Sequence, residues 1–156
     1  MNKQIPKYKL LKTKKKLHKK AWGLYSTYRR SSEADFQGYV ECYTCLKKIP
    51  WQEAHLGHFL HGKLDFDLRN TKIQCCGCNT FKDGNLGEYA QRLIEENGLE
   101  WLKQLKKDAV KGNDYSIEEL EDIINVVTKL KNLKWNTHQN NLRLKGDSSL
   151  KTTITK

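Results

Sequence analysis

Four of the five cysteines form two matched pairs, Cys42-x-x-Cys45 and Cys75-x-x-Cys78. A C-x-x-C turn directs two thiolates to one side of a metal ion, and two such turns complete a closed tetrahedral site of the structural zinc type. The spacing therefore predicts a structural Zn²⁺ site on these four sulfurs rather than four merely buried cysteines. Cys76 could replace Cys75 as a ligand, but the second turn would then be the less common C-x-C.

Three histidines recur at every third position between the cysteine pairs, namely His55, His58 and His61. Gly57 and Gly62 disfavour a helix here, so we expect a bent strand or a hairpin loop. On such a segment His55 and His58 could converge on one site for a metal ion and a water molecule. A lone histidine is more often structural than catalytic, but three within seven residues, clasped by a zinc site, favour a functional role.

Composition points to a polyanionic partner. The chain of 156 residues carries 29 Lys and Arg against 18 Asp and Glu, a formal net charge of +11, which favours nucleic acid over the weaker alternative of a membrane surface. No apolar run approaches the ~20 residues of a transmembrane helix. The N-terminus lacks the apolar core of a secretory signal. We therefore expect a cytoplasmic protein whose cysteines stay reduced.

The N-terminal segment is strongly basic, because residues 1–30 contain eleven Lys or Arg and no acidic residue. Apolar residues at helical spacing predict an amphipathic helix from about 9 to 32. This helix could be a solvated cationic face or an arm that contacts phosphates, and the absence of acids favours the arm. The residues expected to contact DNA are Lys14, Lys15, Lys16, Lys19, Lys20, Arg29 and Arg30.

The segment after this helix is expected to hold strands at YVECYTC, EAHLGHFL and TKIQC. A helix should begin near Asn79, be interrupted at 83–85 and continue as LGEYAQRLIEEN until Gly98. The sequence pattern of residues 99–110 predicts another short helix. Ser116 and Glu119 form a capping-box signature. It opens a long helix with an apolar stripe, which is either a packing face or the surface of a homodimer.

These elements predict an α+β fold with four segments: a basic N-terminal helical arm (1–35), a zinc-stapled core (36–98), C-terminal helices (99–140) and a mobile tail (141–156). Only 37% of the residues are hydrophobic, so the core must be small and a metal ion would help to stabilise it.

The motifs run in the order Cys-x-x-Cys, His-x-x-His-Phe, Arg-Asn and then Cys-x-x-Cys-Asn, with a Lys three residues after that Asn. This order resembles that of the HNH nucleases. In these ββα-metal endonucleases a hairpin and a helix surround one divalent cation. Residues 10–135 resemble more closely the phage NinG/Rap recombination proteins, most clearly in GYVECYTCLKKIPW, GHF, NTKIQCCGCNTFKDGN and EYAQRL. The resemblance implies a zinc-clasped HNH core and hydrolysis of branched DNA such as Holliday junctions and displacement loops, in the bacterial host cell.

The resemblance also implies roles for single residues. His58 would be the general base, since a neutral imidazole can take a proton from the attacking water. Asn70 would bridge the hairpin and hold the His58 loop, although it could be a simple turn residue. Asn79 would be a ligand of the catalytic Mg²⁺ or Mn²⁺, held in place by its neighbour Cys78, although it could be a helix N-cap.

Two further assignments are less specific. His55 would be the second ligand of the catalytic cation, where relatives usually carry an acidic residue, so the choice of ion is open. Lys82 could contact the scissile phosphate or be a plain surface lysine, and His61 is the fallback base or ligand. Symmetric resolution of a four-way junction needs two cuts, which favours a homodimer. The competing interpretation is a non-catalytic, zinc-stabilised module that binds nucleic acid.

Overall fold

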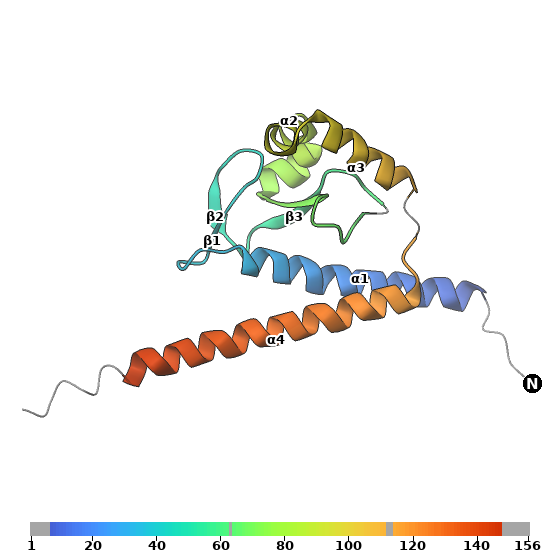
Figure 1. Cartoon of the computed structure of the whole chain (residues 1–156). Coiled ribbons are helices and arrows are strands. Elements are labelled where there is room, and N and C mark those ends of the chain that lie inside the picture. Colours follow the sequence, from blue (N-terminus) through green and yellow to red (C-terminus); the bar gives the residue numbers. More distant parts are fainter. Residues whose placement is uncertain (1–6, 63, 112–113, 148–156) are drawn as a thin grey trace, which may run out of the picture.

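The computed structural model of the chain has an α+β fold in which two long helices lie side by side beneath a small layer of strands and short helices (Figure 1). It describes residues 7–62, 64–111 and 114–147, with side chains described for 10–62, 64–111 and 114–134. The predicted α+β class is therefore confirmed. Within the described part of the chain, no helix is both long enough and apolar enough to cross a bilayer.

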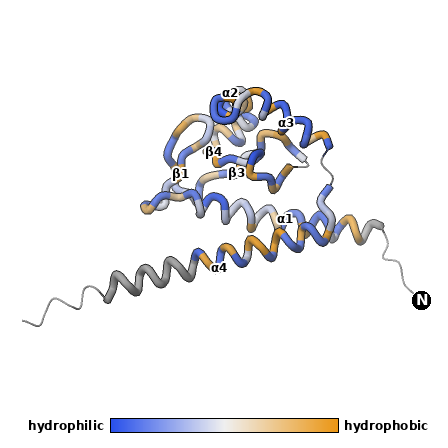
Figure 2. The backbone as a smooth tube through the Cα atoms, viewed as in Figure 1, coloured by the Kyte–Doolittle hydropathy of each residue, from blue (hydrophilic) through white to orange (hydrophobic). Residues whose placement is uncertain are grey.

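The two long helices are α1 (Lys7–Ser32) and α4 (Ile117–Asp147). Hydropathy alternates along α1 and along the coloured part of α4, as expected of amphipathic helices that share an interface (Figure 2). Ala21 of α1 is buried against Leu120 and Ile124 of α4. The predicted stripe on α4 is thus a packing face at its N-terminal end.

The start of α4 carries the predicted capping box. The backbone N–H of Ser116 donates to Glu119 Oε2 over 2.6 Å, and the backbone N–H of Glu119 donates to Ser116 Oγ over 3.1 Å. α4 continues to Asp147, beyond the boundary of the C-terminal helices expected near residue 140. The rest of the expected mobile tail, 148–156, lies outside the described residues.

The strands form two antiparallel pairs. β1 (Tyr39–Glu41) pairs with β2 (Lys48–Pro50), and β3 (His55–His58) pairs with β4 (Thr71–Gln74). The pattern in the sequence did not predict β2. It is three residues long with a single buried side chain and ends in proline, so it leaves no detectable alternation.

Two short helical turns and then two helices follow β4. The turns are η1 (Gly77–Phe81) and η2 (Asp83–Asn85), and the helices are α2 (Leu86–Asn97) and α3 (Leu99–Lys111). The predicted interruption at 83–85 is confirmed, since Gly84 has a φ of +82° inside η2. Gly98, with a φ of +89°, ends α2 as predicted. Helices α2 and α3 enclose a second core around Tyr89, Leu93 and Leu102.

Candidate active site

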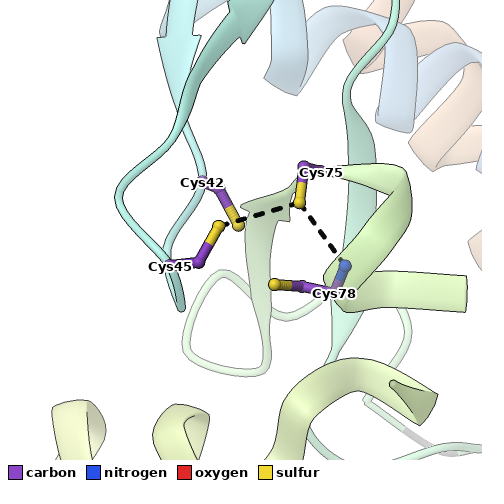
Figure 3. Close-up of side chains that lie close together, drawn as sticks. All are labelled: Cys42, Cys45, Cys75 and Cys78. Carbon is purple, nitrogen blue, oxygen red and sulfur yellow. Dashed lines mark hydrogen bonds between the residues drawn. The ribbon is translucent and has the colours of Figure 1, made fainter. Parts of the chain in front are cut away.

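Four cysteine sulfurs meet between the two hairpins (Figure 3). Cys42 and Cys45 come from the turn between β1 and β2, whereas Cys75 follows β4 and Cys78 lies in η1. All four sulfurs lie within 4.8 Å of one another, and Cys45 Sγ is 3.8 Å from Cys75 Sγ. Tetrahedral zinc with bonds of about 2.3 Å places its sulfurs about 3.8 Å apart, whereas a disulfide needs about 2.05 Å. The cluster therefore fits a structural Zn²⁺ ion, as predicted.

Local hydrogen bonds prepare this cluster for a cation. Burial raises the pKa of the Cys42 thiol, but hydrogen bonds from the backbone of Cys75 and Cys45 and from Thr44 bring it down to about 6. The backbone N–H of Cys78 donates to Cys75 Sγ over 3.4 Å. Thiolates are the form that zinc binds, so these donors favour the ligand state of Cys42, whereas burial raises the pKa of Cys45 and of Cys78. Cys76 is exposed and stands outside the cluster.

The second cysteine turn carries Asn79 to one face of β3. The backbone N–H of Asn79 donates to Cys75 O over 2.9 Å, and its side-chain Nδ2 lies 3.1 Å from His55 Nδ1. Amide nitrogen and oxygen are assigned from the hydrogen-bond network, so a flipped amide would present oxygen to the imidazole. Two ligand atoms about 3 Å apart suit neighbouring positions around an octahedral cation with bonds of about 2.1 Å. His55 and Asn79 thus lie about as close together as two ligands of one cation would.

Gly57 makes room for this arrangement. A Cβ at this position would lie 2.0 Å from Gln74 Oε1 and 2.7 Å from Asn79 Oδ1, so only glycine allows the approach. Gln74 is fully buried, and its Nε2 donates to Gly84 O over 2.6 Å. Its Oε1 has no hydrogen-bond partner among the described residues and is a further oxygen that a cation could use. The sequence offered no signal for Gln74 beyond its place before Cys75.

His58 lies on the opposite face of β3. Its ring stacks on Trp22 of α1, with ring centroids 4.3 Å apart and an interplanar angle of 25°. Burial lowers the pKa of His58 and outweighs the Asp65 carboxylate, which raises it. The imidazole is therefore neutral at neutral pH, which is the state that a general base requires.

We expected the side chains of His55 and His58 to converge on one site, but they lie on opposite faces of β3. Side chains alternate between the two faces of a strand, so residues three positions apart face opposite ways. His55 and Gly57 face Asn79, whereas Leu56 and His58 face α1. Only the backbone of β3 separates the two faces, and His58 is the last residue of that strand.

An open cleft of about 770 Å³ lies beside His58. Three of the lysines predicted to contact DNA line it, and these are Lys14, Lys15 and Lys19 of α1. Lys16 and Lys20 are exposed on the same helix but outside this lining. The cleft is also lined by His18, Trp22 and Asp65, which the sequence analysis did not identify, because no motif spacing links them to His58.

Arg29 and Arg30 are corrections to the predicted DNA contacts. Arg29 is 9% exposed and donates to Glu33 Oε1, Tyr25 Oη and Thr71 Oγ1 at 2.7 to 3.1 Å. Arg30 donates to the carbonyl oxygen of Ala54 over 2.8 Å. Both guanidinium groups tie the end of α1 to the hairpins, because this part of the helix packs on the core. They serve the fold rather than a phosphate.

Lys82 lies on the zinc side of the hairpin. It lines a groove of about 410 Å³ with Cys45, Cys75 and Cys78. Lys82 is not one of the described residues that line the cleft beside His58. Its predicted contact with the scissile phosphate therefore has no support in this arrangement, whereas its alternative role as a surface lysine does.

Asn70 closes the loop that follows β3. It is fully buried, its Oδ1 accepts from the backbone N–H of Leu60 over 2.8 Å, and its Nδ2 donates to Leu60 O and Leu64 O over 2.7 and 3.0 Å. Three hydrogen bonds from one buried amide fix the shape of this loop. The structure thus places Asn70 as a brace of the loop that follows His58.

Comparison with known proteins gives two matches. A family model described as bacteriophage lambda NinG protein matches residues 2–136. The protein named ninG of Salmonella phage P22 is 32% identical over 99 residues, which cover 61% of this chain and 48% of that protein. The chain therefore spans about half the length of this curated relative. No solved structure matches.

Proposed function

We propose that this chain, which belongs to the NinG family, is a metal-dependent endonuclease of the HNH type that hydrolyses phosphodiesters in branched DNA. The observation that carries the proposal is the arrangement around β3. The zinc turn brings Asn79 against His55 on one face of β3, and His58 ends the same strand on the opposite face, beside a cleft lined by lysines. We further propose that it acts in the cytoplasm of the phage's bacterial host.

The chemistry assigned to the chain's own residues is proton transfer and positioning. His58 takes a proton from a water molecule, and the resulting hydroxide attacks the phosphorus. The bond to the 3′ oxygen breaks, and the leaving oxygen takes a proton from solvent, which gives a 3′ hydroxyl and a 5′ phosphate. His58 then releases its proton to solvent. Mg²⁺ or Mn²⁺, held by His55 and Asn79, would supply Lewis-acid stabilisation of the negative charge that develops on the phosphate and the leaving oxygen.

The substrate is proposed from charge and shape. Lys14, Lys15 and Lys19 line the cleft beside His58, and Lys16 and Lys20 continue the basic surface of α1. These lysines would contact backbone phosphates, so affinity should fall steeply as salt rises. Backbone contacts carry no sequence information, and preference for a branch would come from DNA shape and deformability.

The cation ligands give a direct experiment. His55→Ala and Asn79→Ala should each raise the Mn²⁺ concentration needed for half-maximal cleavage of a four-way junction by about 10-fold or more, because each removes one protein ligand. Junction affinity measured without divalent ions should stay unchanged. Cys76→Ser is the matched control, because this exposed thiol lies outside the zinc cluster yet close to Asn79 in sequence. Equal Mn²⁺ requirements for all three variants and the wild type would remove His55 and Asn79 from the cation site.

A second copy of the chain is proposed to complete symmetric cleavage. Val126, Leu130 and Leu133 of α4 are 55%, 37% and 63% exposed, so α1 leaves these apolar side chains partly uncovered. These side chains would pack against a second α4. Sedimentation equilibrium should show a dimer that Leu130→Lys converts to a monomer. A monomer at all concentrations up to about 100 µM, where weak dimers assemble, would contradict this.

The competing function is a non-catalytic module that binds nucleic acid. The four-cysteine cluster and the lysines of α1 favour it, since neither requires chemistry. The two functions differ in one measurable way. A binding module would bind branched DNA and leave it uncut with every divalent ion.

A further inference from the structure

We propose that Asp65 is the positioning residue of His58 and that His18 of α1 holds Asp65 in place. This inference rests on the proposed function, because it specifies which nitrogen of His58 accepts the proton from water. It adds two residues to the site that the cysteine and histidine motifs do not include. It also makes the N-terminal helix part of the reacting centre as well as a surface for phosphates.

The contacts converge on one carboxylate. Asp65 Oδ2 lies 3.0 Å from His18 Nε2, and Asp65 Oδ1 lies 3.5 Å from His58 Nε2. The Asp65 side chain is 16% exposed and that of His58 is 14% exposed, so this second pair is largely shielded from solvent. A carboxylate between two imidazoles in such a setting has strong attraction for an N–H donor on each side.

His58 Nε2 needs a partner. It is buried and has no hydrogen-bond partner among the described residues, with Asp65 Oδ1 3.5 Å away. Burial lowers the pKa of this ring, whereas both the carboxylate and the backbone of Asp65 raise it. An approach of about 0.5 Å by Asp65 would complete the bond, and catalytic hydrogen bonds often tighten in this way when substrate binds. Asp65 Oδ1 is the acceptor in place to satisfy this nitrogen.

The loop that carries Asp65 is fixed on both sides. Phe66 packs edge-on against the His18 ring at 5.3 Å and against Tyr115 at 4.9 Å, which docks the loop on α1 and on the start of α4. The backbone N–H of Gly62 donates to Asp65 Oδ1 over 3.3 Å. Asn70 braces the same loop from inside, so the carboxylate is held at a defined place.

The chemical consequence is a fixed tautomer. With Asp65 as acceptor, His58 carries its proton on Nε2 and presents the lone pair of Nδ1 to the attacking water. When Nδ1 takes the proton of that water, the ring becomes an imidazolium ion and Asp65 stays ionised beside it. A neighbouring carboxylate stabilises that cation and keeps the ring in one orientation.

The first test does not depend on cleavage. Nitrogen-15 NMR of the zinc-loaded chain reports the tautomer of each imidazole, and five histidines allow assignment by single replacement. We expect His58 to be the Nε2–H tautomer in the wild type and a mixture of tautomers in Asp65→Asn. Glu121→Gln, on the exposed face of α4, is the matched charge control and should leave the spectrum unchanged. The same tautomer populations in wild type and Asp65→Asn would overturn the proposal, whether or not the chain cuts DNA.

The second test uses cleavage and separates positioning from binding. Asp65→Asn should lower kcat on a four-way junction by about 10- to 100-fold and leave KM within twofold, because the base keeps its place but loses its fixed tautomer. His18→Gln should retain most of the rate, since its amide can still donate to Asp65, whereas His18→Leu should lose it. Equal rates for His18→Gln and His18→Leu, or a change in KM alone, would contradict the assigned role.

Discussion

Replacing His58 with alanine is expected to slow cleavage of branched DNA by about 100- to 10,000-fold, the usual contribution of a general base. The physical reason is that burial lowers the pKa of this imidazole, so its neutral form is ready to accept a proton at neutral pH. Binding should change little, because the proposed contacts with the DNA backbone come from the cleft lysines and not from His58. The measurement is single-turnover cleavage with saturating Mn²⁺, together with a Kd from fluorescence anisotropy.

His61→Ala is the control for this variant. His61 lies three residues further on, is exposed, and its ring centroid is 5.6 Å from that of His58. It should cleave within about threefold of the wild-type rate, since its imidazole has no proton to move. If His58→Ala cuts as fast as wild type while His61→Ala does not, His61 is the base and the assignment of His58 is wrong.

Replacing Cys42 or Cys78 with serine is expected to abolish zinc binding and cooperative folding together. Each sulfur is buried within the cluster, and structural zinc contributes roughly 10–16 kcal/mol of binding free energy that is also folding free energy. Metal content by mass spectrometry should fall below one zinc ion per chain. The thermal unfolding transition of the wild type should broaden or vanish.

Cys76→Ser provides the contrast, since it removes a thiol next to the cluster without touching it. It should keep one zinc ion and melt within about 2 °C of the wild type. A chelator should convert the wild type, but not an already zinc-free Cys42→Ser chain, to the less stable form. Full stability of Cys42→Ser without metal would show that the hairpins do not need the ion.

Local patterns predicted the parts of the structure that depend on short-range chemistry. The two C-x-x-C turns, the capping box at Ser116 and the stop at Gly98 all appear where the sequence placed them. Each requires residues only a few positions apart, so spacing alone carries the information. The α+β class followed from the same signals, whereas β2 was too short to leave one.

The candidate site was less predictable because it depends on contacts between distant segments. Which face of β3 each histidine takes follows from strand alternation, but only once the strand is known to include both His55 and His58. The inward use of Arg29 depends on its packing against Thr71 of another element. The contact of His18 with Asp65 joins α1 to the loop after β3, and no motif spans that separation.

The most direct test of the account is a cleavage panel with the zinc-loaded wild-type chain. End-labelled four-way junction, displacement loop, flap and linear duplex are each incubated with Mg²⁺, Mn²⁺ or EDTA, and binding is followed in parallel. A nuclease of this kind should cut the branched substrates only with a divalent ion, should leave 5′ phosphates and should cut little linear duplex. Branched DNA that is bound but stays intact with every ion would contradict it and would leave a zinc-stabilised binding module.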